Sequence, residues 1–226
     1  MDIAAEFAQR GPWVTKFTID GVDTGGAFDA MNDVRVTQFF DHFTDVKTVL
    51  ELGSLEGGHS FAIAKGRGVE RVVAIEARKA NIEKAMFIQS LLGDSRVTFI
   101  ETNLEKVDLT AMGRFDAVFC SGLLYHLPEP WDLIERLAKI TDKIFIWTQY
   151  ACENEAKKIS DGYRGKWYRE GGWLDPLSGI SKYSFWLSMG SLLKLLTVNG
   201  FDKVAIIDNN LNHPNGCSVT LAASRS

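Results

Sequence analysis

The sequence has few cysteines, no long hydrophobic run and no excess of basic residues. Its three cysteines, Cys120, Cys152 and Cys217, are odd in number and do not form CxxC pairs, so we expect neither a disulfide framework nor a zinc site, and a reducing cytoplasm as the compartment. No window approaches about 18 uninterrupted apolar residues, and the first residues lack a signal-peptide pattern. The net charge is −4 with scattered Lys and Arg, which argues against bulk attraction to nucleic acid.

The chain that remains has the composition of an ordinary globular protein. It has 226 residues, of which 46% are hydrophobic and 24% charged. Short apolar, β-rich runs alternate with segments long enough for helices, which predicts a doubly wound α/β domain with a largely parallel sheet. The runs are Val46–Leu52, Arg71–Glu76, Val97–Ile100, Phe115–Cys120 and Lys143–Trp147.

The segments on either side of this core have other patterns. Residues 1–45 contain a strand-like piece and a predicted helix, Asp33–Phe43, and we expect them to cap the carboxyl ends of the strands. Residues 150–187 are rich in Gly, aromatic and charged residues without a clean period, which indicates an inserted lid. Residues 188–226 predict a helix, Met189–Asn199, and an antiparallel hairpin joined by a turn at 208–216. We therefore expect one domain of four parts, 1–45, 46–149, 150–187 and 188–226.

The strongest local motif is VLELGSLEGGHS, residues 49–60. An apolar strand ends at Glu51, turns at Gly53 and enters a helix near Gly57, and glycines there let a ligand approach the backbone closely. The dinucleotide fingerprint G-x-G-x-x-G is excluded, because Leu55 stands where its second glycine would be. An acidic side chain at the end of a buried strand calls for a cationic partner such as an ammonium group.

These residues resemble the first motif of the class I S-adenosylmethionine-dependent methyltransferases, which reads acidic-x-Gly-x-x-x-Gly. The match lies at Glu51, Gly53 and Gly57, and Glu76 ends the next strand where the family's acidic residue binds both ribose hydroxyls. The resemblance implies S-adenosylmethionine as cofactor. It also implies a seven-stranded mixed sheet of order 3-2-1-4-5-7-6.

Two later segments of the sequence extend the resemblance. The loop after the third strand, which contacts adenine in the family, has Asn103 where Asp is common, and the fourth strand leads to Ser121–Leu123 beside the expected methyl donor. The cofactor residues that we predict are Glu51, Gly53, Ser54, Leu55, Gly57, His59, Glu76, Ala77, Asn103, Leu104, Ser121, Gly122 and Leu123.

A narrower resemblance concerns the strings GLLYHL, SKYSFW and LLKLLTVNGF. Similar strings occur in the enzymes that carboxymethylate wobble uridine in tRNA and in many small-molecule methyltransferases. The acidic composition argues against tRNA as the substrate. We therefore expect methyl transfer to an oxygen or nitrogen of a small, apolar or aromatic metabolite. Two alternatives stay open: a tRNA wobble-uridine methyl or carboxymethyl transferase, and a non-catalytic cofactor-binding scaffold.

Candidate catalytic and acceptor residues follow the fourth strand and occupy the predicted lid. His126 is placed to take a proton from an acceptor hydroxyl, although it could instead order the loop before Pro128. Metal ligands are not expected, because the positions after the fourth and fifth strands read Cys-Ser-Gly and Thr-Gln-Tyr. The acceptor-binding candidates are Arg35, Tyr125, Tyr150, Trp167 and Tyr168. We expect a monomer or homodimer.

Overall fold

The computed structural model describes all residues from 1 to 226, in two compact units, Met1–Asn103 and Leu104–Ser226, which we describe separately. The seven-stranded sheet has the order β11-β12-β7-β6-β3-β4-β5. When only the seven strands of this sheet are numbered in chain order, the sheet has the predicted order 3-2-1-4-5-7-6. The doubly wound α/β class is therefore confirmed.

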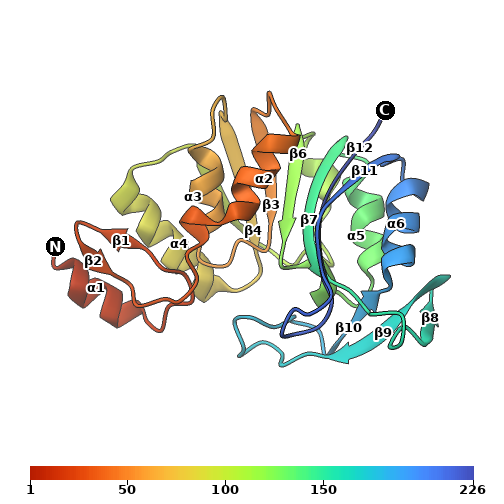
Figure 1. The fold of residues 1–226 in the computed structure, drawn as a ribbon. Coiled ribbons are helices and arrows are strands. Elements are labelled where there is room, and N and C mark those ends of the chain that lie inside the picture. The colour runs from red at the N-terminus through yellow and green to blue at the C-terminus, as the bar shows by residue number, and fades with distance from the viewer. The chain divides into compact units, whose positions relative to one another are not determined.

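The first unit contains three parallel strands with helices and an N-terminal segment (Figure 1). Strand β3 pairs in parallel with β4, and β4 with β5, so their carboxyl ends meet at one edge. Helix α4 ends where Gly93 takes a left-handed conformation. The elements are α1 Ile3–Arg10, β1 Thr18–Ile19, β2 Val22–Asp23, the 3₁₀ helix η1 Ala30–Asn32, α2 Val34–His42, β3 Thr48–Leu52, α3 Gly58–Ala64, β4 Arg71–Glu76, α4 Lys79–Leu92 and β5 Val97–Glu101.

The N-terminal segment is fastened to the loop after β3 by one buried carboxylate. Glu56 is fully buried and accepts hydrogen bonds from the backbone amides of Val14 and Thr15, at 3.0 and 2.6 Å. Lys84 on α4 completes this site with an ion pair of 2.7 Å. The segment is thus attached to the loop that follows β3, and its role as a cap stays a prediction.

The second unit contains two parallel strands and the C-terminal hairpin. Strand β6 runs parallel to β7, while β12 is antiparallel to both β7 and β11. Helices α5 and α6 pack against each other. The elements of this part are the 3₁₀ helices η2 Leu109–Met112 and η3 Leu124–His126, strand β6 Ala117–Ser121, α5 Pro130–Leu137, β7 Lys143–Gln149, α6 Met189–Val198, β11 Lys203–Asn210 and β12 Ser218–Ser224.

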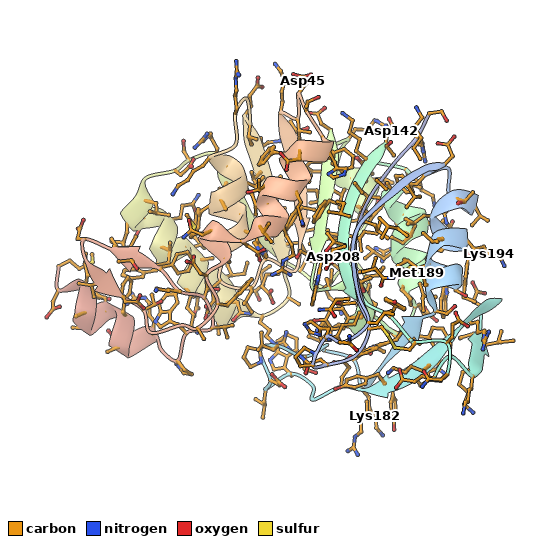
Figure 2. All side chains as sticks on the ribbon, in the orientation of Figure 1. Asp45, Asp142, Lys182, Met189, Lys194 and Asp208 are labelled. Carbon is orange, nitrogen blue, oxygen red and sulfur yellow. A yellow bond between two sulfur atoms is a disulfide. The ribbon has the colours of Figure 1, made fainter.

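The predicted lid contains regular structure that the sequence pattern does not show. Strands β8 (Lys158–Ser160), β9 (Tyr163–Arg169) and β10 (Tyr183–Leu187) form an antiparallel sheet in the order β10-β9-β8. Charged residues and Gly165 interrupt the alternation along β9. Gly165 is required there, because an added Cβ would lie 2.1 Å from the backbone oxygen of Trp186 on the paired strand. Figure 2 shows Lys182, just before β10, projecting away from this sheet.

Two further expectations are wrong. Cys152 and Cys217 form a disulfide, because the antiparallel pairing of β12 with β7 brings together cysteines that are 65 positions apart. Asp208, Asn209 and Asn210 belong to β11 beyond a register shift rather than to the turn, and Asn209 accepts a hydrogen bond from Tyr150. Cys120 is buried and unpaired. None of the helices is long and apolar enough to cross a membrane.

Candidate active site

The glycine motif forms a tight turn at the carboxyl end of β3. Gly53 and Gly57 take left-handed conformations, with φ of 71° and 84°, and so does Leu55, with φ of 52°. The amides of Gly53 and Ser54 both donate to the carbonyl of Ile75, the residue before Glu76. A Cβ at Gly57 would lie 2.8 Å from the ring of Phe99, so glycine is required there. The turn is thereby fixed against the end of β4.

Glu51 is a buried carboxylate near the end of β3. It is 2% exposed and accepts a short hydrogen bond from the hydroxyl of Ser60 on α3. Burial raises the pKa of Glu51 to about 7, and the negative charge of Glu76 adds to the rise, while the bond from Ser60 opposes it. A cationic ligand at this position would return the carboxyl to its charged form.

A buried ionic network joins the glycine turn to the N-terminal segment. Asp33 caps α2 by accepting from the amide of Arg35, and its Oδ2 lies 2.9 Å from Nε2 of His59. The other ring nitrogen of His59, Nδ1, lies 3.9 Å from Glu51. Burial works against the charge of Asp33, but hydrogen bonds from His59 and Arg35 hold its pKa well below the usual range. Burial lowers the pKa of His59, and the bond to Asp33 opposes the change.

Arg35 and His59 are therefore placed in a network of side chains. Arg35 forms a close ion pair with Asp33 and lies over the ring of Phe28, 5.4 Å from its centroid. This geometry gives Arg35 a structural ion pair. The predicted ligand contacts of Arg35 and His59 stay predictions.

Glu76 is oriented by the loops on both sides of it. Its Oε2 accepts from the amide of Leu55 at 3.0 Å, and its Oε1 accepts from the amide of Arg78 at 2.8 Å. Burial raises the pKa of Glu76, and these two amides oppose the rise. The loop after β5 starts beside it, since the amide of Thr102 donates to the Glu76 carbonyl. Each carboxylate oxygen keeps capacity for a further donor, as a pair of adjacent hydroxyls would supply.

One buried polar atom of the glycine turn lacks a partner. The hydroxyl of Ser54 makes no hydrogen bond. A buried polar atom without a partner is costly, and a polar group of a ligand would satisfy it. Ser54, with Glu51 and Glu76, fits a ligand that carries a cation and a diol.

The second unit presents its candidates directly after β6. Gly122 takes a left-handed φ of 81° and its amide donates to the carbonyl of Trp147 on β7. The chain then forms η3, where the ring of Tyr125 packs edge-on against Trp147 and Trp186, at 5.9 and 5.7 Å. Ser121, Gly122, Tyr125 and His126 thus lie at the carboxyl end of β6, and their roles stay predictions.

His126 has a carboxylate partner that the sequence analysis missed. Its Nδ1 lies 3.0 Å from Oε2 of Glu170, which directly follows β9. Burial acts to raise the pKa of Glu170, but hydrogen bonds from His126, Ser178 and Ser184 outweigh it and lower the pKa to about 2. Nothing in the local sequence marks Glu170, because the pairing depends on how the lid folds back over η3.

Aromatic residues of the lid pack around Trp186. Tyr168 stacks on it at 4.8 Å, and the ammonium of Lys166 lies 4.4 Å from its ring centre. Trp186 is 2% exposed, and its indole N–H makes no hydrogen bond. Trp167 packs instead against Phe185 and stays 47% exposed.

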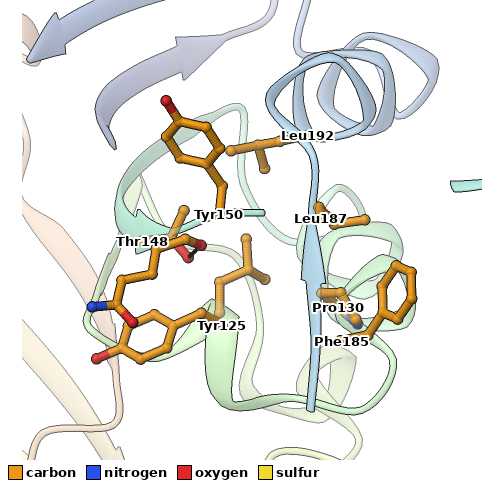
Figure 3. Close-up of a pocket in the computed structure, with 9 residues that line it drawn as sticks. Tyr125, Pro130, Thr148, Tyr150, Phe185, Leu187 and Leu192 are labelled. Carbon is orange, nitrogen blue, oxygen red and sulfur yellow. Dashed lines mark hydrogen bonds between the residues drawn. The ribbon is translucent and has the colours of Figure 1, made fainter. Parts of the chain in front are cut away.

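A small pocket lies beneath η3 in the second unit (Figure 3). Tyr150 lines it and is buried, with its hydroxyl bonded to Asn209. Its walls are mostly apolar, with two polar residues from the end of β7. The lining residues are Leu124, Tyr125, Pro130, Thr148, Gln149, Tyr150, Phe185, Leu187 and Leu192.

Comparison with known proteins relates this site to one enzyme family. Residues 43–168 match a family model described as a methyltransferase domain. The N-terminal domain of EvdMO1, crystallised in the presence of S-adenosylhomocysteine and D-fucose, superposes with a TM-score of 0.90 and 29% identity, covering 100% of this chain and 98% of that one.

Two other comparisons are more distant. The tRNA U34 carboxymethyltransferase of Cronobacter sakazakii is 27% identical over 138 residues, which is 58% of this chain and 40% of that enzyme. The chain thus spans less than half the length of this curated relative. Magnesium protoporphyrin IX methyltransferase from Synechocystis PCC 6803, with bound S-adenosylmethionine, shares the fold at a TM-score of 0.57 and 18% identity, over 87% of this chain and 78% of that one.

Proposed function

The chain belongs to the class I S-adenosylmethionine-dependent methyltransferases, and we propose that it methylates an oxygen of a small molecule. S-adenosylmethionine is its cofactor and supplies an electrophilic methyl group when bound. The proposal about the acceptor rests on one observation: a histidine at the carboxyl end of β6 is held by Glu170 through Nδ1, with Nε2 unbonded. A histidine in this state can accept a proton from a hydroxyl.

For the cofactor we propose that Glu51 pairs with the ammonium group and Glu76 binds the ribose hydroxyls. Their burial supports these roles, as does the unpaired Ser54 hydroxyl in the same unit. The remaining contacts are assigned by family resemblance. They are the turn residues Gly53, Leu55 and Gly57, the adjacent Ala77, the adenine-side pair Asn103 and Leu104, and Ser121 to Leu123.

For the acceptor we propose a compound that presents both a hydroxyl group and an apolar face, such as a deoxysugar ring. The aromatic surroundings of Tyr125 and Trp186 favour an apolar face. The orphaned indole N–H of Trp186 favours a polar substituent beside it. The similarity to a domain crystallised with D-fucose supports the same class of compound. Holding the hydroxyl in line with the methyl group would provide most of the rate, and proton removal would add to it.

The test is transfer of a radiolabelled methyl group from S-adenosylmethionine to a panel of small hydroxyl compounds that starts with D-fucose. We expect a methylated sugar-like product, and mass spectrometry of its fragments would identify the methylated atom. Labelling of amines but of no hydroxyl compound in the panel would contradict the proposal.

One second candidate is supported by a specific observation, the 27% identity to tRNA U34 carboxymethyltransferase. That activity would require a tRNA-binding surface, whereas the net charge is −4. A gel shift with bulk tRNA at low salt separates the candidates. Retention that disappears with increasing salt would favour the tRNA enzyme.

A further inference from the structure

Glu170 is the most completely satisfied carboxylate in the second unit. Its side chain is 1% exposed, and each of its two carboxylate oxygens has a hydrogen-bond donor beside it. Oε2 accepts from Ser178 at 2.6 Å and from the Gly179 amide at 2.7 Å, in addition to its contact with His126. Oε1 accepts from Ser184 at 2.5 Å.

The loop that carries Ser178 and Gly179 packs closely against the backbone of His126. A Cβ at Gly179 would lie 2.6 Å from the carbonyl oxygen of His126 and 3.0 Å from the carboxyl carbon of Glu170. The amide of Phe185 on β10 also donates to the carbonyl of Leu127 at 2.9 Å. The carboxylate is therefore fixed relative to the imidazole from both sides.

We propose that Glu170 is a positioning residue that keeps the imidazole of His126 in the tautomer with hydrogen on Nδ1, leaving Nε2 as the proton acceptor. An ionised carboxylate can only accept, so Nδ1 must carry the hydrogen at their 3.0 Å contact. During transfer the acceptor hydroxyl would give its proton to Nε2 as its oxygen bonds to the methyl carbon, and the bond from that carbon to the cofactor sulfur would break to leave S-adenosylhomocysteine. Glu170 would then face an imidazolium whose charge it stabilises. This inference rests on the proposed function of His126 as base.

Three substitutions separate positioning from support of the loop. Glu170→Ala removes the acceptor. Glu170→Gln can keep an oxygen toward His126, Ser178 and Gly179, while its amide group faces Ser184, whose hydroxyl can accept as well as donate. Ser184→Ala is the matched control, since it removes one donor to the same carboxylate without touching the His126 contact.

The experiment is ¹⁵N NMR of histidine-labelled protein with S-adenosylhomocysteine added, at a pH where the imidazoles are neutral. The chain has four histidines, and a His126→Gln spectrum assigns the signal. We expect the Nδ1–H tautomer in the parent, Glu170→Gln and Ser184→Ala proteins, and a shift of the signal toward the Nε2–H tautomer in Glu170→Ala. Circular dichroism verifies that each variant is folded.

A parent protein in the Nε2–H form, or an unchanged tautomer in Glu170→Ala, would overturn the proposal. The same shift in Ser184→Ala would overturn it too, because general disturbance of the loop would then explain the effect. The spectra require no turnover. If the tautomer responds as expected and His126→Ala still methylates the acceptor at the parent rate, the assignment of His126 as base fails while the positioning by Glu170 stands.

Discussion

Each half of the molecule contains a largely buried histidine, yet the two differ in how many carboxylates face the ring. In the first unit, His59 lies between Asp33 and Glu51, with one nitrogen 2.9 Å and the other 3.9 Å from a carboxylate oxygen. In the second unit, His126 meets one carboxylate through Nδ1 alone. The side chains are similarly buried, 10% and 13% exposed, so exposure does not distinguish them.

The carboxylates around each ring indicate what each histidine can do. A histidine with a carboxylate on each side links the elements that carry those carboxylates. A histidine with one oriented nitrogen keeps the other for proton transfer. We therefore expect substitutions in the first unit to change cofactor binding and substitutions in the second to change turnover.

The largest expected effect separates the two histidines directly. His126→Ala should lower kcat by about 10²–10⁴-fold, the usual contribution of a general base, and leave the affinity for S-adenosylhomocysteine unchanged. His59→Ala should weaken that affinity and lower kcat little at saturating cofactor. Initial rates and calorimetric titration of both variants measure the two quantities. A rate for His126→Ala within a few-fold of the parent would show that its role is structural.

A second difference between the units is covalent. The second unit is cross-linked by Cys152–Cys217, and the first relies on buried ionic contacts such as those of Glu56. Replacing both cysteines by serine should reduce the free energy of unfolding by about 2–4 kcal/mol, because the bridge restricts the unfolded chain. Guanidinium denaturation with and without reductant measures the loss. Three reactive thiols in unreduced, denatured protein, where one is expected from Cys120, would contradict the bridge.

The sequence predicted the core of the fold because that information is local. Each buried strand is an apolar run, and Gly53, Gly57 and Glu76 mark the turn by residue type and spacing. The same reasoning missed Glu170 and the disulfide. His126 lies 44 residues before Glu170, and Cys217 lies 65 residues after Cys152. No pattern in the chain specifies how the lid folds over η3. The contact of Asp33 with His59 was not predicted either, because the sequence shows an aspartate at the start of a helix and not its second partner.

A smaller effect is expected at the ribose site of the first unit. Glu76→Ala should weaken binding of S-adenosylhomocysteine by about 1–3 kcal/mol, because the hydroxyls and the amide of Leu55 lose their acceptor. Calorimetric titration measures the change. Ser184→Ala, in the other unit, is the control and should bind the nucleotide normally. Equal affinity in Glu76→Ala and the parent would exclude Glu76 from the cofactor site.

The smallest effect is a pH dependence of cofactor binding that arises in the first unit. Burial raises the pKa of Glu51 to about 7 in the ligand-free protein, so below that pH the carboxyl is mostly protonated. Pairing with the cofactor ammonium needs the charged carboxylate, and binding must then release a proton. Affinity for S-adenosylmethionine should therefore fall by up to about tenfold for each pH unit below 7 and level off above it.

The raised pKa of Glu51 has the opposite effect on the stability of the ligand-free protein, which falls as the pH rises. The folded state holds a proton that the unfolded state releases, so ionisation of Glu51 destabilises the fold as the pH rises from the ordinary carboxyl value of 4.5 to about 7. Glu51→Gln should flatten both dependences, while Glu76→Gln controls for the neighbouring carboxyl, whose pKa burial also raises. Titrations between about pH 5.5 and 7, where the α-amino group of the cofactor stays protonated, measure the affinity. A pH dependence that persists unchanged in Glu51→Gln would place the titrating group elsewhere and remove the main physical reason for assigning the ammonium to Glu51.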